Sequence, residues 1–128
     1  MKSILGTWRL VAEAAWDETG ASHPPVFGPE PLGLATFNAV GRMMAVLSDG
    51  RAGPLEARPY VSYSGAYTFD GARLVTHVDG ASEPRFFETA QIREARFEND
   101  RMILRPPPRR IGAHEISREL SWERLASS

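Results

Sequence analysis

The sequence of 128 residues contains no cysteine. Disulfide bonds, thiolate catalysis and cysteine-type zinc sites are therefore excluded, and the composition fits a reducing cytoplasm. No apolar run approaches the length of about 18 residues that a transmembrane helix needs, so no spanning segment is expected. The N-terminal stretch Met1-Lys2-Ser3-Ile4-Leu5-Gly6 becomes polar too early for a signal peptide.

The sequence also lacks an excess of charge of either sign. It has 15 basic and 16 acidic side chains, which gives a formal net charge of -1. Nucleic acids and anionic membranes both require a basic surface, so neither is expected as a partner. The length predicts one domain over residues 1–128, and 42% hydrophobic residues are ordinary for a globular protein. Homodimerisation stays open.

Glycine and proline are abundant, with 11 and 10 residues, and they divide the chain into short segments. Apolar and polar residues alternate with period two in these segments, which predicts strands rather than helices. The expected strands cover about residues 6–16, 32–37, 42–48, 60–69, 72–79, 88–98, 101–105 and 118–125. Eight strands in sequence order leave no exposed edge when they close, so we predict an all-β, antiparallel up-and-down barrel.

The lengths of the connections give this barrel two different ends. The second, fourth and sixth connections are tight, and they contain Gly41, Asp70-Gly71 and Asn99-Asp100. The remaining connections are long. Because alternate connections of a meander lie at opposite ends, the long ones should form a single rim. An eight-stranded barrel has room for one small ligand, so this rim is interpreted as a mouth with a lid.

Several short segments resemble the bacterial lipocalin-like domain proteins of the calycin superfamily. They are Gly6-Thr7-Trp8-Arg9-Leu10-Val11, residues 24–33, Gly41-Arg42-Met43, residues 63–67, residues 75–78 and Trp122-Glu123-Arg124-Leu125. The resemblance implies that Trp8 plugs the closed end and that Arg124 stacks on it. It also implies a hydrophobic ligand or substrate in the lumen. Many members have no known activity, while some related small barrels are cofactor-free cyclases or isomerases of natural-product pathways.

The predicted turns also set which residues face the interior. With Asp70-Gly71 as a two-residue turn, Tyr67 pairs with Leu74 and Tyr63 with Val78, on a bulky face that should point inward. In the first strand, period two places Glu13 on the outer face with Arg9. The opposite, inner face of that strand would carry Trp8, Leu10, Ala12, Ala14 and Trp16.

The sixth strand predicts an unusual inward residue. With Asn99-Asp100 as the turn, the inward face continues from Phe97 to Arg93 and Gln91. An inward arginine is costly unless it is paired, so Arg93 is a candidate anchor for a carboxylate, enolate or carbonyl oxygen. The alternative is a register shifted by one residue, which would turn Arg93 to solvent.

The other candidate site residues are less specific. Tyr63 and Tyr67 are candidate hydrogen-bond donors or acids, and core packing is the alternative. His77 is a candidate base, because histidine changes charge near neutral pH, although the register places it on the less bulky face. Arg93, Tyr67 and His77 are thus the predicted catalytic residues. The predicted ligand-binding residues are Tyr63, Gln91, Phe37, Met43, Leu47 and Trp122.

A metal site is not predicted. His23, His77 and His114 are expected at the same end of the barrel, but no pair has a tight ligand spacing. No cofactor is predicted either. Three hypotheses follow: a cofactor-free cyclase or isomerase acting on a hydrophobic small molecule, a non-catalytic carrier or sensor of such a molecule, and a structural barrel with a filled core.

Overall fold

The computed structural model describes residues 2–54 and 57–126, which form nine strands and one short 3-10 helix. The strands are β1 (Gly6–Trp16), β2 (Pro31–Phe37), β3 (Arg42–Asp49), β4 (Tyr60–Phe69), β5 (Arg73–Ala81), β6 (Ala90–Glu98), β7 (Arg101–Arg105), β8 (Arg109–Ile111) and β9 (His114–Ala126). The 3-10 helix η1 (Pro84–Phe86) lies between β5 and β6. No helix of the described part is long and apolar enough to cross a membrane.

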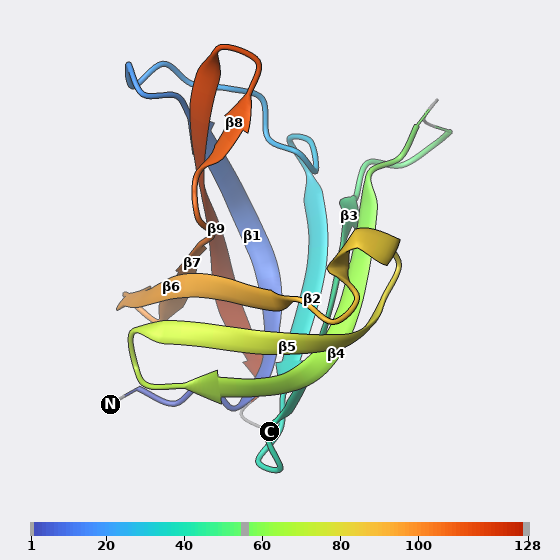
Figure 1. Cartoon of the computed structure of the whole chain (residues 1–128), viewed down its shortest axis with the longest axis vertical. Coiled ribbons are helices and arrows are strands. Elements are labelled where there is room, and N and C mark those ends of the chain that lie inside the picture. The colour runs from blue at the N-terminus through green and yellow to red at the C-terminus, as the bar shows by residue number, and fades with distance from the viewer. Residues whose placement is uncertain (1, 55–56, 127–128) are drawn as a thin grey trace.

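The strands close into a barrel (Figure 1). Strands β1 to β7 pair in sequence order, β7 pairs with β9, and β9 returns to pair with β1. All pairings are antiparallel. The predicted eight-stranded antiparallel barrel is thus confirmed, and β1–β7 and β9 are its eight strands. Figure 1 places the β2–β3 turn at the bottom, and the β1–β2 connection and the β8–β9 hairpin at the top.

The chain between β7 and β9 is not the open loop that the sequence analysis expected. Instead β8 pairs with the start of β9, through Arg109↔Ile116 and Ile111↔His114. The turn of this hairpin is Gly112-Ala113, and Gly112 has a φ of 61°, which glycine adopts without strain. Strand β9 consequently begins at His114 rather than near residue 118.

The turns at residues 99–100 and 70–73 decide whether the predicted strand pairings are correct. Asn99 and Asp100 both adopt positive φ, and the pairs Phe97↔Met102 and Ala95↔Leu104 confirm the predicted β6–β7 register. The two-residue turn at Asp70-Gly71 is wrong. Residues 70–73 form a longer turn, because the Asp70 carboxylate accepts hydrogen bonds from the backbone N–H groups of residues 72 and 73.

This longer turn shifts the β4–β5 pairing by two residues relative to the prediction. Phe69 pairs with Leu74, and Tyr67 pairs with Thr76. A shift of two residues keeps every side chain on its predicted face, since strand side chains alternate with period two. The predicted pairs are therefore wrong, while the predicted inward face of β4 survives.

A bulge in β1 reverses the faces of its second half. The pairing with β9 shifts between Leu10 and Ala12, where one extra residue enters β1. Trp8 and Leu10 point inward as predicted, but beyond the bulge Ala15 is buried and Ala12 is exposed. The predicted faces of four residues are therefore wrong, with Glu13 on the inner side and Ala12, Ala14 and Trp16 on the outer side.

The β4–β5 pairing is irregular between Ser64 and Gly65, because Asp79 is an extra residue on β5 at this point. Figure 1 shows β4 changing direction, from a course alongside β3 to one alongside β5. A Cβ atom at Gly65 would lie 2.1 Å from the backbone oxygen of His77 on β5, so only glycine allows the two strands to approach here. The bend carries the inward face of β4 across the barrel.

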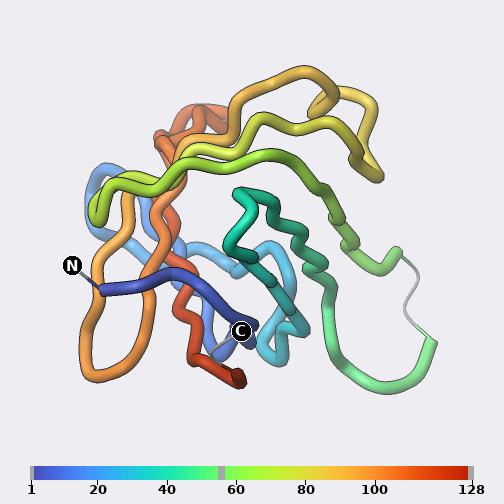
Figure 2. The backbone as a smooth tube through the Cα atoms, turned by 90° about the horizontal axis from the view of Figure 1, so that it is seen from below, coloured from blue at the N-terminus to red at the C-terminus, as the bar shows by residue number. Residues whose placement is uncertain are grey.

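The end of the barrel with the short turns is plugged by Trp8, which is 1% exposed. The Arg124 guanidinium lies 4.2 Å from the centre of its ring, and the indole N–H donates to the Ile4 carbonyl at 2.9 Å. Arg124 also donates to the carbonyl oxygens of Ser3 and Leu5. Figure 2, seen from below, shows the N-terminal segment crossing this end. The predicted stacking of Arg124 on Trp8 is confirmed.

Candidate ligand-binding site

The inward face of the barrel carries both almost completely buried and half-buried side chains. Near the plug, Leu10, Phe37 and Met102 are almost completely buried. Towards the long connections, inward side chains are only half-buried. These are Val61 and Tyr63 on β4, Gln91 and Arg93 on β6, and Arg118 on β9. Phe69 and Phe97, inward residues beside the short turns, are half-buried as well, so the partly exposed inner face extends along the barrel.

Arg93 lies on this partly exposed inner face. Along β6, half-buried and exposed residues alternate, and Arg93 shares the half-buried side with Gln91, Ala95 and Phe97. Its guanidinium donates to the Ile92 carbonyl at 2.9 Å and to Oε1 of Gln91. In the part of the chain that the structure describes, no carboxylate forms an ion pair with it. Desolvation lowers the pKa of Arg93, yet a guanidinium stays charged at neutral pH.

Tyr63 is a titratable residue on β4, which is separated from β6 by β5, and it lies close enough to Arg93 for their charges to interact. Burial raises the pKa of Tyr63, and the positive charge of Arg93 partly offsets this effect. The hydroxyl group therefore remains protonated at neutral pH and can donate a hydrogen bond. Together, Arg93 and Tyr63 place a fixed cation and a neutral donor in the same partly desolvated region.

Glu13 and Arg118 form an ion pair inside the barrel that the sequence analysis missed. The Glu13 side chain is 0% exposed, and Arg118 donates to its Oε2 through Nε at 2.9 Å and Nη2 at 2.8 Å. The backbone N–H groups of Val26 and Phe27 also donate to this carboxylate, both at 3.1 Å. The carboxylate is thus saturated, and it joins β1, β9 and the β1–β2 connection.

Trp122 contributes a polar atom without a partner. The side chain is buried in the core, and its Nε1 has no hydrogen-bond acceptor among the described residues. Its ring extends towards Gly33 on β2, where an added Cβ atom would lie 3.4 Å from the indole Cη2. A buried N–H group without an acceptor is unusual in a folded protein.

The structure brings together only some of the predicted site residues. Arg93, Gln91 and Tyr63 share the half-buried inner face, which is the face predicted for them. The apolar residues predicted to line the ligand are almost fully buried in the core, and they are Phe37, Met43, Leu47 and Trp122.

Tyr67 and His77, the two other predicted catalytic residues, have different surroundings. The Tyr67 hydroxyl donates to the Asn38 carbonyl at 2.9 Å, and its ring packs edge-on against Phe37. Burial raises the pKa of Tyr67. Its hydroxyl therefore serves the β2–β3 turn. His77 is exposed on the outer face of β5, as its register predicted.

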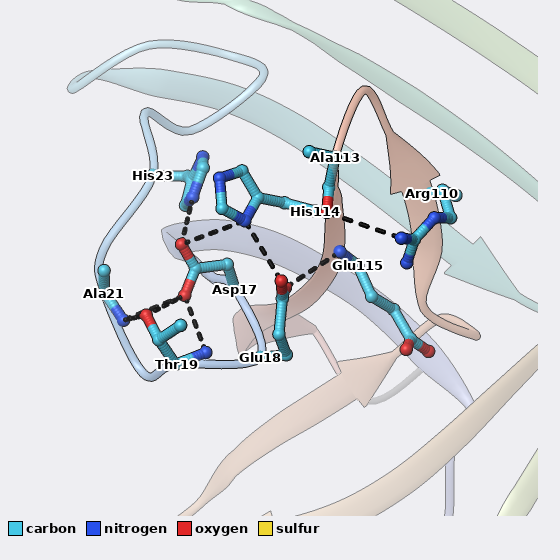
Figure 3. A network of polar contacts seen from close by, with 9 residues as sticks. All are labelled: Asp17, Glu18, Thr19, Ala21, His23, Arg110, Ala113, His114 and Glu115. Carbon is cyan, nitrogen blue, oxygen red and sulfur yellow. Dashed lines mark hydrogen bonds and ion pairs between the residues drawn. The ribbon is translucent and has the colours of Figure 1, made fainter.

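A polar network at the rim joins the β1–β2 connection to the β8–β9 hairpin (Figure 3). His23 Nε2 lies 2.8 Å from Oδ2 of Asp17, and His114 Nδ1 lies 3.1 Å from Oε1 of Glu18. Hydrogen bonds from the Thr19 hydroxyl and from His23 lower the pKa of Asp17. His23 and His114 thus meet as predicted. Within residues 2–54 and 57–126, no group of three or more His, Asp or Glu side chains is arranged to hold a metal ion.

Asp49, at the end of β3, is the centre of a second group of hydrogen bonds at the rim of the barrel. Its side chain is 2% exposed and accepts hydrogen bonds from the Arg51 guanidinium, including one of 2.7 Å from Nη2. Arg58 donates to the Asp49 carbonyl at 2.6 Å. Gly28 leaves space for the carboxylate, because a Cβ atom there would lie 2.5 Å from Oδ2. Asp49 therefore connects the β1–β2 and β3–β4 connections.

Asp49→Asn is expected to destabilise the protein at neutral pH and to have little effect near pH 2. The hydrogen bonds from Arg51 lower the pKa of Asp49 from 3.8 to about 2. The carboxylate therefore stabilises the fold fully above about pH 4, and this stabilisation is lost as the pH falls towards 2. Urea unfolding of both proteins between pH 2 and pH 7 measures the difference. A difference that does not change with pH would contradict the prediction.

One hollow of the surface lies outside the barrel. Its volume is about 450 Å³, and it is bounded by outward-facing residues of β5, β6 and β7 and by the β4–β5 turn. Its lining is mostly charged and includes Arg73, Glu94, Arg96 and Arg105. Such a lining does not suit a hydrophobic ligand, since pockets for these ligands are predominantly apolar.

Comparison with known proteins adds one finding. A family model described as a lipocalin-like domain matches residues 54–125, which is more than half of the chain. No curated protein and no solved structure gives a significant match. A barrel of this type suggests the binding of a hydrophobic ligand in general.

Proposed function

Because the chain belongs to the lipocalin-like domain family, we propose that it binds a hydrophobic small molecule inside the barrel, at the end with the long connections. The observation that carries this proposal is the group of inward side chains that the core leaves half-buried. The plugged end is packed by buried residues such as Trp8 and Met102, whereas Val61, Tyr63 and Arg93 remain half-buried.

The composition of the accessible inner face supports the same proposal. Val61 and Tyr63 pack against the core and present apolar and aromatic surface beside the polar side chains of Gln91, Arg93 and Arg118. Small-molecule sites are mostly apolar and contain a small number of oriented polar groups. A core without room for a ligand would instead bury these inward side chains completely.

A neutral hydrophobic fluorophore, N-phenyl-1-naphthylamine, provides the test. We expect wild-type protein to bind it with an increase in fluorescence. Val61→Trp should weaken binding at least tenfold, because the larger side chain occupies the accessible inner face. Val40→Trp is the matched control, since Val40 is 83% exposed in the β2–β3 turn at the opposite end. Equal binding by both variants would place the fluorophore elsewhere and overturn the proposal.

Catalysis is a second candidate function, and the placement of Arg93 and Tyr63 on the same inner face favours it. A guanidinium in a partly desolvated site polarises a carbonyl oxygen, and a neighbouring tyrosine hydroxyl can donate a hydrogen bond to the developing oxyanion. The shaped wall would hold a flexible substrate in a reactive conformation. A cofactor-free cyclase or isomerase needs no further group, because cyclisation and isomerisation of this kind only rearrange the atoms of the substrate.

Identification of the bound molecule separates catalysis from transport. Untargeted mass spectrometry of the purified protein should detect a copurifying hydrophobic compound. On prolonged incubation with excess compound, an enzyme is expected to yield a product of the same mass, and Arg93→Ala should slow its formation. Recovery of the compound unchanged would favour the carrier or sensor.

A further inference from the structure

We propose that the ligand of this site is an anion, with one acidic group such as a carboxylate or an enolate that Arg93 binds. This inference rests on the proposed binding function and specifies the charge of the ligand. It follows from an account of the charges and hydrogen-bonding groups on the inner face.

The charges on the inner face do not balance. The negative charge of Glu13 is neutralised by Arg118, which contacts it through two guanidinium nitrogens. Arg93 has no carboxylate partner in the described part of the chain, and its charge and that of Arg118 disfavour each other. The described inner face around these three residues therefore carries one surplus positive charge.

The hydrogen-bonding groups are unbalanced in the same direction. The Glu13 carboxylate accepts from Arg118 and from two backbone N–H groups, and Gln91 Oε1 accepts from Arg93. Arg93 carries five N–H donors, and its Nη1 and Nη2 each make one hydrogen bond. Among the described residues, the buried Nε1 of Trp122 also has no acceptor. This part of the interior thus holds hydrogen-bond donors that no described acceptor engages.

A ligand that enters this region displaces water from Arg93. A neutral, purely apolar ligand would leave the guanidinium without solvation, which costs free energy. An acidic group would replace the lost water with a charge-assisted hydrogen bond. The protonated hydroxyl of Tyr63 adds a neutral donor and no opposing charge. Both the charge and the donors of the site therefore select an anion over a neutral molecule of the same shape.

Two fluorophores with the same ring system test this selection. N-phenyl-1-naphthylamine is neutral, and 8-anilinonaphthalene-1-sulfonate adds one sulfonate, which stands in for the acidic group. We expect wild-type protein to bind the sulfonate at least tenfold more tightly, as a hydrogen bond to a charged group warrants. Arg93→Gln should abolish this preference by weakening the binding of the sulfonate, and continued binding of the neutral fluorophore reports that the interior remains folded.

Two further variants control for charge in general. Arg93→Lys keeps the positive charge and should retain most of the preference. Arg73→Gln removes an exposed arginine on the outer side of the adjacent strand β5 and should leave the preference intact. Equal wild-type affinity for both fluorophores, or a preference that survives Arg93→Gln, would overturn this inference alone. Failure of the wild type to bind either fluorophore would overturn the proposed binding function and the inference with it.

Discussion

Glu13→Ala is expected to lower the free energy of unfolding by about 3–5 kcal/mol, which is the usual cost of removing one partner from a buried ion pair. The substitution leaves the Arg118 guanidinium inside the barrel without its carboxylate. It also leaves the backbone N–H groups of Val26 and Phe27 without their acceptor. Urea unfolding followed by circular dichroism measures the loss.

Two comparisons make this prediction specific. Glu123→Ala removes the exposed ion pair between Glu123 and Arg9, and its expected cost is only about 0–1 kcal/mol. Glu13→Met combined with Arg118→Met removes both charges and should recover most of the stability lost in Glu13→Ala. If Glu13→Ala lowers the free energy of unfolding no more than Glu123→Ala does, the interior ion pair does not stabilise the fold and the prediction is wrong.

Trp8→Ala should destabilise the protein by a similar amount, about 3–5 kcal/mol. The substitution leaves a void at the plugged end, since Trp8 is almost fully buried. It also removes the aromatic ring beneath Arg124 and the indole donor to the Ile4 carbonyl. The free energy of unfolding, measured by circular dichroism in urea, should fall accordingly.

Trp16 provides a matched control for this prediction. It also lies beneath an arginine, with the Arg105 guanidinium 5.2 Å from its ring centre, but it is only partly buried on the outer surface. Trp16→Ala should therefore cost clearly less than Trp8→Ala, because the cost follows burial more than the cation–π contact. Equal losses for the two variants would contradict the assignment of Trp8 as the plug.

The features that could be predicted from the sequence are those set by local residue types. Period-two alternation predicted the strands, and closure followed from their number and order. Asn99 and Asp100 both tolerate positive φ, so the β6–β7 register was predictable, and with it the inward placement of Arg93. The stacking of Arg124 on Trp8 could be predicted through resemblance to a known family.

The features that could not be predicted depend on tertiary pairing. The bulge in β1 results from the pairing of β1 with β9, and the residue types around Val11 do not predict it. Glu13 was therefore assigned to the wrong face, and its ion pair with Arg118 was missed. The β4–β5 turn was misassigned because the Asp70 side chain stabilises a longer turn than Asp-Gly usually forms. The β8–β9 hairpin, by contrast, has a local determinant, because Gly112 adopts the positive φ that its two-residue turn needs.

The pairing of β1 with β9 also has a kinetic consequence. These two strands are among the most distant in the sequence, with partners such as Thr7 and Ala126, yet each needs the other as a neighbour. Loop-closure entropy opposes such a non-local contact until much of the remaining sheet exists. Refolding should therefore be slow compared with that of helical proteins of this size. An intermediate in which β1 and β9 are not yet paired would expose two strand edges that can pair with other chains.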